Sequence, residues 1–206
     1  MDKLDMKKEY NFYKAKENKI DILQIPKLNY LKIDGIGNPS SSIDYQNSIE
    51  ALYTIAYTIK FTIKNDGKDF VVMPLEGLWY ADHMSDFEEN NKDNWKWTSM
   101  ILMPDFVTKE IFETAKIKAQ EKKIDNTKIN EVRLELLEEN TVAQTLYVGP
   151  YVKEHETIMN IHNYIKESGN VLCGLHHEIY LSDPRKVTSE KLKTIIRQPF
   201  TKKSYK

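Results

Sequence analysis

One pattern of predicted elements occurs twice along the chain, and this repeat limits the folds that the chain can adopt. A strand that ends near Gly37 is followed by a helix and by a strand that contains Glu76. A second strand ends at Gly149, and again a helix and a strand with a glutamate, Glu178, come after it. The sequence therefore predicts an α+β fold of two βαββ modules related by a pseudo-twofold axis. We expect antiparallel sheets with helices packed on one face, and a ligand cleft between the modules.

The spacing of apolar residues gives the individual elements. Apolar residues at three- and four-residue steps predict three helices, at 42–63, 108–123 and 153–169. Ser41 or Ser42 is the expected N-cap of the first helix, and Gly169 closes the last one. Alternating or continuous apolar runs predict strands. These strands lie within 27–40, at 69–82, at 94–104, as two strands within 130–151 joined by a turn at 138–140, at 171–181 and at 191–200.

The repeat also predicts how the chain is divided. We expect a single domain from residue 26 to residue 200, preceded by an N-terminal arm at 1–25 and followed by a tail at 201–206. Within this domain the first module covers 26–104, a connecting helix covers 108–123, and the second module covers 129–200.

Each repeat places a glutamate in an apolar strand, where an ionised side chain is rarely buried without a partner. Matching the glutamate of "PLEGLWY" with the glutamate of "LHHEIYL" puts Glu76 and Glu178 at equivalent positions. The two-residue period of a strand places His176 and Tyr180 on the face of Glu178, and Tyr80 on the face of Glu76. A partly dehydrated carboxylate among aromatic rings favours a cation, and burial also raises its proton affinity. The glutamates therefore predict a recognition site or a catalytic site, and the alternative is an ordinary pairing with lysine or a solvent-facing edge.

Charge and cysteine content argue against several classes of protein. Thirty basic and thirty-one acidic residues give a formal net charge of −1 without a basic stripe, so we expect no direct nucleic-acid partner. The single cysteine, Cys173, cannot form an internal disulfide, and the N-terminus lacks the apolar segment of a secretory signal. No apolar run approaches the roughly 20 residues needed to cross a bilayer. We therefore expect a cytoplasmic protein without a membrane partner.

Neither a metal nor another cofactor is predicted. His155 and His162 lie two helical turns apart, His176 and His177 point to opposite faces of a strand, and no zinc-type spacing of Cys and His occurs. The "GIG" segment at 35–37 lacks the strand-loop-helix glycine pattern of a phosphate-binding loop.

The second half of the chain resembles a known family. The segments "TLYVGPYVKEHETIMNIHNYIKESG" and "HHEIYLSDPRKVTSEKLKTIIRQPF" are similar to the GyrI-like small-molecule-binding family, which includes drug-binding domains of MerR-type and AraC-type multidrug regulators. The resemblance covers roughly residues 20–200, and "VVMPLEGLWYAD" is similar to a stand-alone bacterial subfamily. It implies two βαββ modules around a ligand pocket in which a glutamate meets cationic hydrophobic drugs. For some stand-alone relatives it implies hydrolysis of cyclopropane-bearing DNA alkylators by a glutamate with aromatic neighbours.

The expected site residues combine this resemblance with the strand faces. Glu178 and Tyr147 are the candidate catalytic residues, although Tyr147 also fits a core tyrosine with a backbone partner. The candidate ligand contacts are Glu76, Trp79, Tyr80, Trp97, His176 and Tyr180. We expect binding of a hydrophobic or aromatic small molecule, with hydrolysis of an electrophilic ring for detoxification. The alternatives are non-catalytic capture or sensing of a cationic compound and, from the family name alone, inhibition of a DNA topoisomerase.

Overall fold

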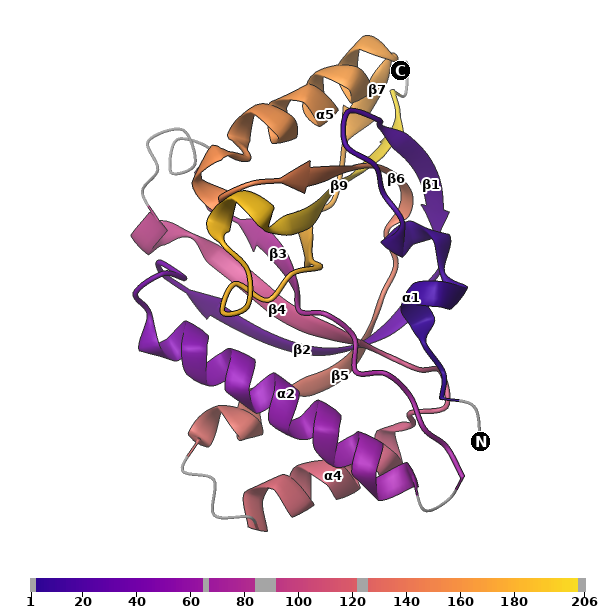
Figure 1. Cartoon of the computed structure of the whole chain (residues 1–206), viewed down its shortest axis with the longest axis vertical. Helices are drawn as coiled ribbons and strands as arrows, with labels where there is room; N and C mark the ends of the chain where they lie inside the picture. Colours follow the sequence, from indigo (N-terminus) through magenta and orange to yellow (C-terminus); the bar gives the residue numbers. More distant parts are fainter. Residues whose placement is uncertain (1–2, 65–66, 84–91, 122–125, 204–206) are drawn as a thin grey trace. The chain divides into compact units, whose positions relative to one another are not determined.

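The structure is a computed structural model that describes residues 3–64, 67–83, 92–121 and 126–203 (Figure 1). The chain forms two compact units. The first unit contains Met1–Glu9 and Leu28–Leu137, and the second contains Tyr10–Lys27 and Glu138–Lys206. The boundary after Leu137 lies inside the second module predicted from the sequence, because β5 belongs to the first unit and β6 to the second.

The first unit is built on an antiparallel sheet. Among the described residues its strands follow the order β3-β4-β2-β5. The bounds are Leu28–Ile36 for β2, Glu76–Tyr80 for β3, Lys96–Met103 for β4 and Arg133–Leu137 for β5. The strand predicted at 94–104 is therefore confirmed as the antiparallel partner of the strand that contains Glu76.

Helix α2 (Ile43–Lys64) packs against β2 and β4, and α4 (Lys109–Glu121) packs against α2. The Ser42 side chain accepts a hydrogen bond from the backbone N–H of Tyr45 at 3.1 Å, which confirms it as the N-cap of α2. The short helix α1 (Met6–Glu9) follows Leu4, which forms a parallel bridge with Phe70. The last two residues of the helix predicted at 108–123 lie outside the described residues.

The main strands of the second unit are antiparallel and follow the order β1-β6-β9-β8. The bounds are Asp21–Ile25 for β1, Asn140–Val148 for β6, His176–Tyr180 for β8 and Lys193–Lys202 for β9, and the short strand β7 (Asn170–Leu172) pairs with the end of β9. Helix α5 (His155–Glu167) covers one face of this sheet (Figure 1). Its residues Ile161 and Ile165 pack against Ala143 of β6 and Ile196 of β9.

Both units contain the predicted βαββ topology. The elements β2-α2-β3-β4 of the first unit correspond in order to β6-α5-β8-β9 of the second, and the sheet orders β3-β4-β2 and β8-β9-β6 also correspond. In each unit one further strand, β5 or β1, pairs with the other edge of the first strand of the βαββ motif.

Three predicted elements differ from those observed. The strand predicted at 171–181 is split into β7 and β8, because Gly174 has a φ of 62° and turns the chain. The strand predicted at 69–82 is limited to Glu76–Tyr80, and the residues around Pro74 are irregular. The predicted arm at 1–25 contains β1, whose apolar residues continue the sheet of the second unit.

Over the described ranges, no helix combines the length and the apolar character that crossing a bilayer requires.

Candidate functional site

Glu178 is the centre of a hydrogen-bonded cluster on β8. The Tyr180 hydroxyl donates to its Oε2 at 2.8 Å, and Nε2 of His176 lies 3.1 Å from its Oε1. Because a carboxylate only accepts hydrogen bonds, Nε2 of His176 is the donor in this contact. The residue is 7% exposed, so the carboxylate is held by two donors in a largely dehydrated place. The predicted grouping of His176, Glu178 and Tyr180 on one strand face is confirmed.

This cluster lies on the face of the sheet that α5 covers. Glu178 pairs directly with Ile196, and directly paired residues point to the same side of a sheet. Ile196 packs against Ile161 of α5, so the side chain of Glu178 is on the α5 side. Two buried polar atoms on this side, Nδ1 of His176 and Oγ1 of Thr194, make no hydrogen bond to the described residues.

Tyr147 lies on the same face, but its hydroxyl is used by the backbone. It donates to the carbonyl oxygen of Pro150 at 2.9 Å. A Cβ atom at Gly149 would lie 2.6 Å from this hydroxyl, and Gly149 has a φ of 150°, so glycine is needed where Tyr147 crosses the turn. The Tyr147 hydroxyl therefore has a backbone partner, as expected for a core tyrosine. The catalytic role of Tyr147 stays a prediction.

Tyr151 extends the cluster, and the sequence reasoning missed it. Its ring contacts the ring of Tyr180 edge to face, with 5.7 Å between centroids. Burial raises the pKa of Tyr151 to about 12, and the negative charges of Glu154, Glu178 and Asp183 act in the same direction. The position of Tyr151 in the "VGPY" turn was visible in the sequence, but only the fold shows that this turn faces β8.

In the first unit Glu76 has a different environment. It is fully buried, and the Tyr30 hydroxyl donates to its Oε2 at 3.3 Å. Trp79, three residues further along β3, contacts Tyr45 of α2, so Trp79 is on the helix side of the sheet. Because side chains alternate along a strand, Glu76 points to the side away from α2. Glu76 and Glu178 therefore face opposite sides relative to the helix of their own unit, and the predicted equivalence is wrong. A shift of one residue in the strand alignment accounts for it.

The tryptophans of the first unit form an aromatic cluster against α2. Tyr45 lies edge to face with Trp97 at 4.9 Å between centroids, and Trp79 lies in the same way against Trp95 at 6.0 Å. Trp97 is fully buried, and a Cβ atom at Gly35 would lie only 2.1 Å from its ring. Packing thus dominates the environment of Trp97. Its role and that of Trp79 as ligand contacts stay predictions.

Tyr80, the last residue of β3, stays a predicted ligand contact as well. It shares the face of Glu76 because the two residues are four positions apart along the strand, which is an even number. The structure therefore separates the four predicted residues of the first unit into two pairs. Trp79 and Trp97 are on the side of α2, and Glu76 and Tyr80 are on the other side.

A second charged cluster is buried in the second unit, on the sheet face away from α5. Arg197 is fully buried and donates through Nη1 to Oε2 of Glu139 at 3.0 Å, and Nδ1 of His177 lies 2.9 Å from Oε1 of the same glutamate. Arg197 also donates through Nη2 to the Phe12 carbonyl at 3.1 Å. Although burial opposes ionisation, the charges and hydrogen bonds of His177 and Arg197 lower the pKa of Glu139 to about 2. These contacts connect residues 10–27 to the sheet.

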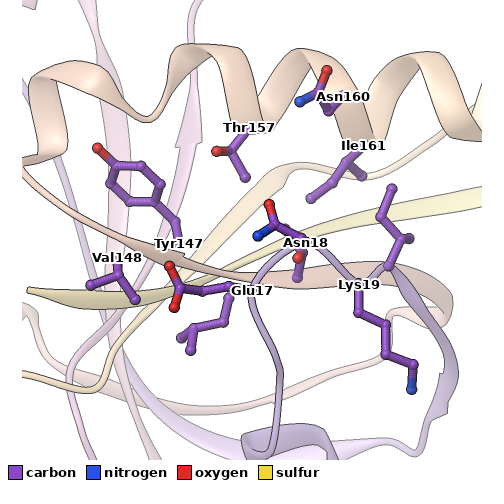
Figure 2. Close-up of a pocket in the computed structure, with 11 residues that line it drawn as sticks. Glu17, Asn18, Lys19, Tyr147, Val148, Thr157, Asn160 and Ile161 are labelled. Carbon is purple, nitrogen blue, oxygen red and sulfur yellow. The ribbon is translucent and has the colours of Figure 1, made fainter.

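A groove of about 440 Å³ lies between α5, the end of β6 and the segment Glu17–Ile20 of the second unit (Figure 2). Figure 2 shows Thr157, Asn160 and Ile161 on the α5 side of this groove, with Tyr147 on the strand below them. The ring of Tyr147 thus contributes to the groove, while Glu178 is not among its lining residues.

The side chains suited to metal binding are dispersed. In the ranges that the structure describes, no three or more histidine, cysteine, aspartate or glutamate side chains come together as metal ligands.

The two βαββ units define the chain as an α+β protein with a duplicated topology, and the second unit contains a buried carboxylate among tyrosines. The model of the GyrI-like small molecule binding domain matches residues 18–200, so the chain belongs to the GyrI-like family. An uncharacterized conserved protein from Listeria innocua is 40% identical, with a TM-score of 0.89 and coverage of 97% of this chain and 100% of that one. A hydrolase from Listeria innocua is also 40% identical, with a TM-score of 0.87 and the same coverage.

A more distant structure shares the fold alone. The C-terminal domain of EcmrR is 13% identical, with a TM-score of 0.58 and coverage of 90% of this chain and 98% of that domain. The comparison with curated proteins gave no match.

Proposed function

We propose that the protein binds a hydrophobic or aromatic small molecule beside Glu178 and hydrolyses an electrophilic cyclopropane ring in it, as a detoxifying hydrolase. One observation carries this proposal: a largely buried carboxylate is held in place by Tyr180 and His176, next to a third aromatic side chain, Tyr151. A carboxylate fixed in this way orients a water molecule, because each oxygen keeps a second lone pair after accepting one hydrogen bond.

The reaction follows from these groups. The oxygen of a water molecule forms a bond to a ring carbon, and the strained C–C bond breaks. Its electron pair passes through the conjugated system to an activated carbonyl oxygen. Glu178 accepts the proton that the water loses, and this proton passes to the carbonyl oxygen, so the net change is addition of water.

Relatives support a hydrolase over a binding protein. The two proteins from Listeria innocua that are described as hydrolases are 38% and 40% identical to this chain and are covered over their full length. The TM-scores of 0.84 and 0.87 show that the backbones of these two proteins correspond to that of this chain over most of the fold.

Turnover of a cyclopropane-bearing alkylator, followed by chromatography, tests the proposal. The wild-type protein should convert the compound to its hydrated product, and Glu178→Gln should lower kcat by about 100-fold or more because the amide cannot accept a proton. Glu167→Gln, on the exposed end of α5, is the matched control and should retain activity. Wild-type turnover that is absent, or that Glu178→Gln matches, contradicts the proposal.

A second function, capture of a cationic compound without turnover, is favoured by the charges around Tyr151. Three carboxylates, those of Glu154, Glu178 and Asp183, act together on its hydroxyl. Carboxylates next to aromatic rings attract an organic cation through both Coulomb and cation–π interactions.

Cationic dyes of different sizes distinguish the two functions. For capture, we expect saturable binding, measured by dye fluorescence, that Glu178→Gln weakens by about tenfold. A neutral dye of the same shape should bind equally to both proteins. Equal affinity of the wild-type protein and Glu178→Gln for the cations would remove this second function.

A further inference from the structure

Helix α2 of the first unit presents a ridge of three aromatic side chains. Tyr53, Tyr57 and Phe61 are four residues apart, so they lie above one another on one face of the helix. The ring centroids of Tyr53 and Tyr57 are 6.4 Å apart, and those of Tyr57 and Phe61 are 6.3 Å apart. Tyr57 is 46% exposed and Phe61 is 59% exposed. Ridges of residues four apart are the surfaces that helices use most often to pack against other helices.

This aromatic ridge lies opposite the face of α2 that packs on its own unit. With 3.6 residues per turn, the fully buried residues of α2 gather about half a turn away from the ridge. They include Ala51, Leu52, Ile55 and Ile59. Single exposed apolar residues are common on protein surfaces, but a contiguous row of rings along one helix face marks an interaction surface.

Charges of opposite sign lie at the two ends of the aromatic ridge. Glu50 is one turn before it and Lys64 is one turn after it, and both residues are exposed. The neutral side chain of Asn126 donates a hydrogen bond to Glu50 at 3.4 Å, so Glu50 keeps its charge. Lys60, the one charged residue between them in the sequence, is buried and pairs with Asp69. The exposed face of α2 therefore consists of an acid, three rings and a base.

This order of groups is complementary to itself when it is reversed. Glu50 and Lys64 are each seven residues from Tyr57, and Tyr53 and Phe61 are each four residues from it. Two antiparallel copies of α2 with Tyr57 on the twofold axis thus bring Tyr53 of one copy against Phe61 of the other. In the same arrangement Glu50 of each copy faces Lys64 of the other. A parallel arrangement would instead place like charges together.

We propose that a second copy of this chain docks on the aromatic ridge, and that the two copies form a symmetric antiparallel dimer through α2. Burial of the rings supplies the attraction, and the two pairs of Glu50 with Lys64 fix the direction of the helices. One helix face from each copy buries less than the roughly 1,600 Å² of a standard interface. The dimer is therefore weak, with a dissociation constant in the micromolar range. Because the ridge belongs to the first unit, its role does not depend on Glu178.

Sedimentation equilibrium of the full chain, at concentrations that span the micromolar range, tests the dimer. Tyr57→Lys places two ammonium groups at the twofold axis and should weaken dimerisation by about 100-fold or more. Tyr164→Lys is the matched control, because it changes a tyrosine that is 41% exposed on helix α5 of the second unit. This control should dimerise as the wild-type protein does. Circular dichroism of each variant shows whether it remains folded.

Reversal of the charges tests the antiparallel arrangement. Glu50→Lys and Lys64→Glu each place like charges opposite one another, and each should weaken dimerisation by about tenfold. The double variant Glu50→Lys/Lys64→Glu exchanges the two charges and should restore the dissociation constant of the wild-type protein. Such a restoration requires that the two positions face each other across the interface.

Three results would overturn the proposal. The first is a wild-type chain that sediments as a monomer throughout the micromolar range, whether or not the ridge binds a different protein. The second is a dimer that Tyr57→Lys leaves intact, because another surface would then join the two copies. The third is a double charge variant that dimerises no better than Glu50→Lys alone, since the two charges would then not face each other.

Discussion

The two units have the same βαββ topology but place their buried charges differently. In the first unit Glu76 is bonded to Tyr30 on the side away from α2, and the helix side is filled with tryptophans. In the second unit the helix side contains Glu178 with its two donors. The opposite side there contains the ion pair of Arg197 and Glu139. A duplicated topology therefore does not preserve which face contains a given residue type, because one residue of shift exchanges the faces.

The largest effect that we expect concerns the buried ion pair of the second unit. Arg197→Met removes the arginine partner from Glu139 and the donor from the Phe12 carbonyl. Breaking a buried pair on one side typically costs about 3–5 kcal/mol. Urea denaturation should show this loss in the free energy of unfolding.

The matched control is in the first unit. Arg133 pairs with Asp34 at 2.7 Å, but both side chains are substantially exposed, at 34% and 50%. Exposed pairs contribute about 0–1 kcal/mol, so Arg133→Met should change the free energy of unfolding little. If Arg197→Met and Arg133→Met lowered the free energy of unfolding equally, burial would not determine how much each ion pair contributes to stability.

The pH dependence of stability gives the next effect. The pKa of Glu139 is about 2 in the folded chain, below the usual value of 4.5. Because the unfolded chain takes up this proton first, the stabilisation is fully present above about pH 4.5 and is lost as the pH falls toward 2. The loss amounts to about 3 kcal/mol.

Chemical denaturation at several pH values between 6 and 2 measures the slope of the free energy of unfolding against pH. Glu139→Gln should flatten this slope, because the glutamine has no proton to take up. In the first unit, Lys96 lowers the pKa of Asp82 through a hydrogen bond, but the Asp82 side chain is largely exposed. Asp82→Asn should therefore leave the slope nearly unchanged. A variant Glu139→Gln with the wild-type slope would mean that this cluster is not charged as described.

Much of the fold was predictable from local patterns. The helices α2, α4 and α5 and the pairing of β3 with β4 followed from apolar spacing and from caps such as Ser42 and Gly169. The split at Gly174 was not predicted, because a glycine within an apolar run does not reveal its φ in the sequence. The role of β1 depended on pairing with β6, which is more than 100 residues away and leaves no local signal.

The site was predictable only in part. The face shared by His176, Glu178 and Tyr180 required nothing beyond strand alternation. Tyr151 and Glu139 were missed because each becomes part of a cluster only through tertiary contacts, with Tyr180 and with Arg197 respectively. An arginine in the apolar run "TIIRQPF" was the one sequence signal that could have indicated a buried partner for Glu139.

A smaller effect is expected at the glycine beneath Trp97 in the first unit. A Cβ atom at Gly35 would lie 2.1 Å from the ring, so Gly35→Ala must displace the tryptophan. Overpacking of this kind costs about 1–3 kcal/mol. Thermal unfolding followed by tryptophan fluorescence measures it. In a Trp97→Leu background the penalty should largely disappear, and a penalty that persists there would assign the effect to the backbone instead of the ring.

The smallest effect concerns the helix starts, which also differ between the units. The Ser42 side chain caps α2, whereas the residue before α5, Glu154, makes no capping hydrogen bond through its side chain. Ser42→Ala should therefore lower the free energy of unfolding by about 1 kcal/mol, and Ser42→Gly should lower it by only about 0.3 kcal/mol. Differential scanning calorimetry of both variants provides the measurement. A glycine variant as unstable as the alanine variant would show that the first turn of α2 depends on the serine for more than its cap, since glycine adopts the N-cap backbone readily without offering an acceptor.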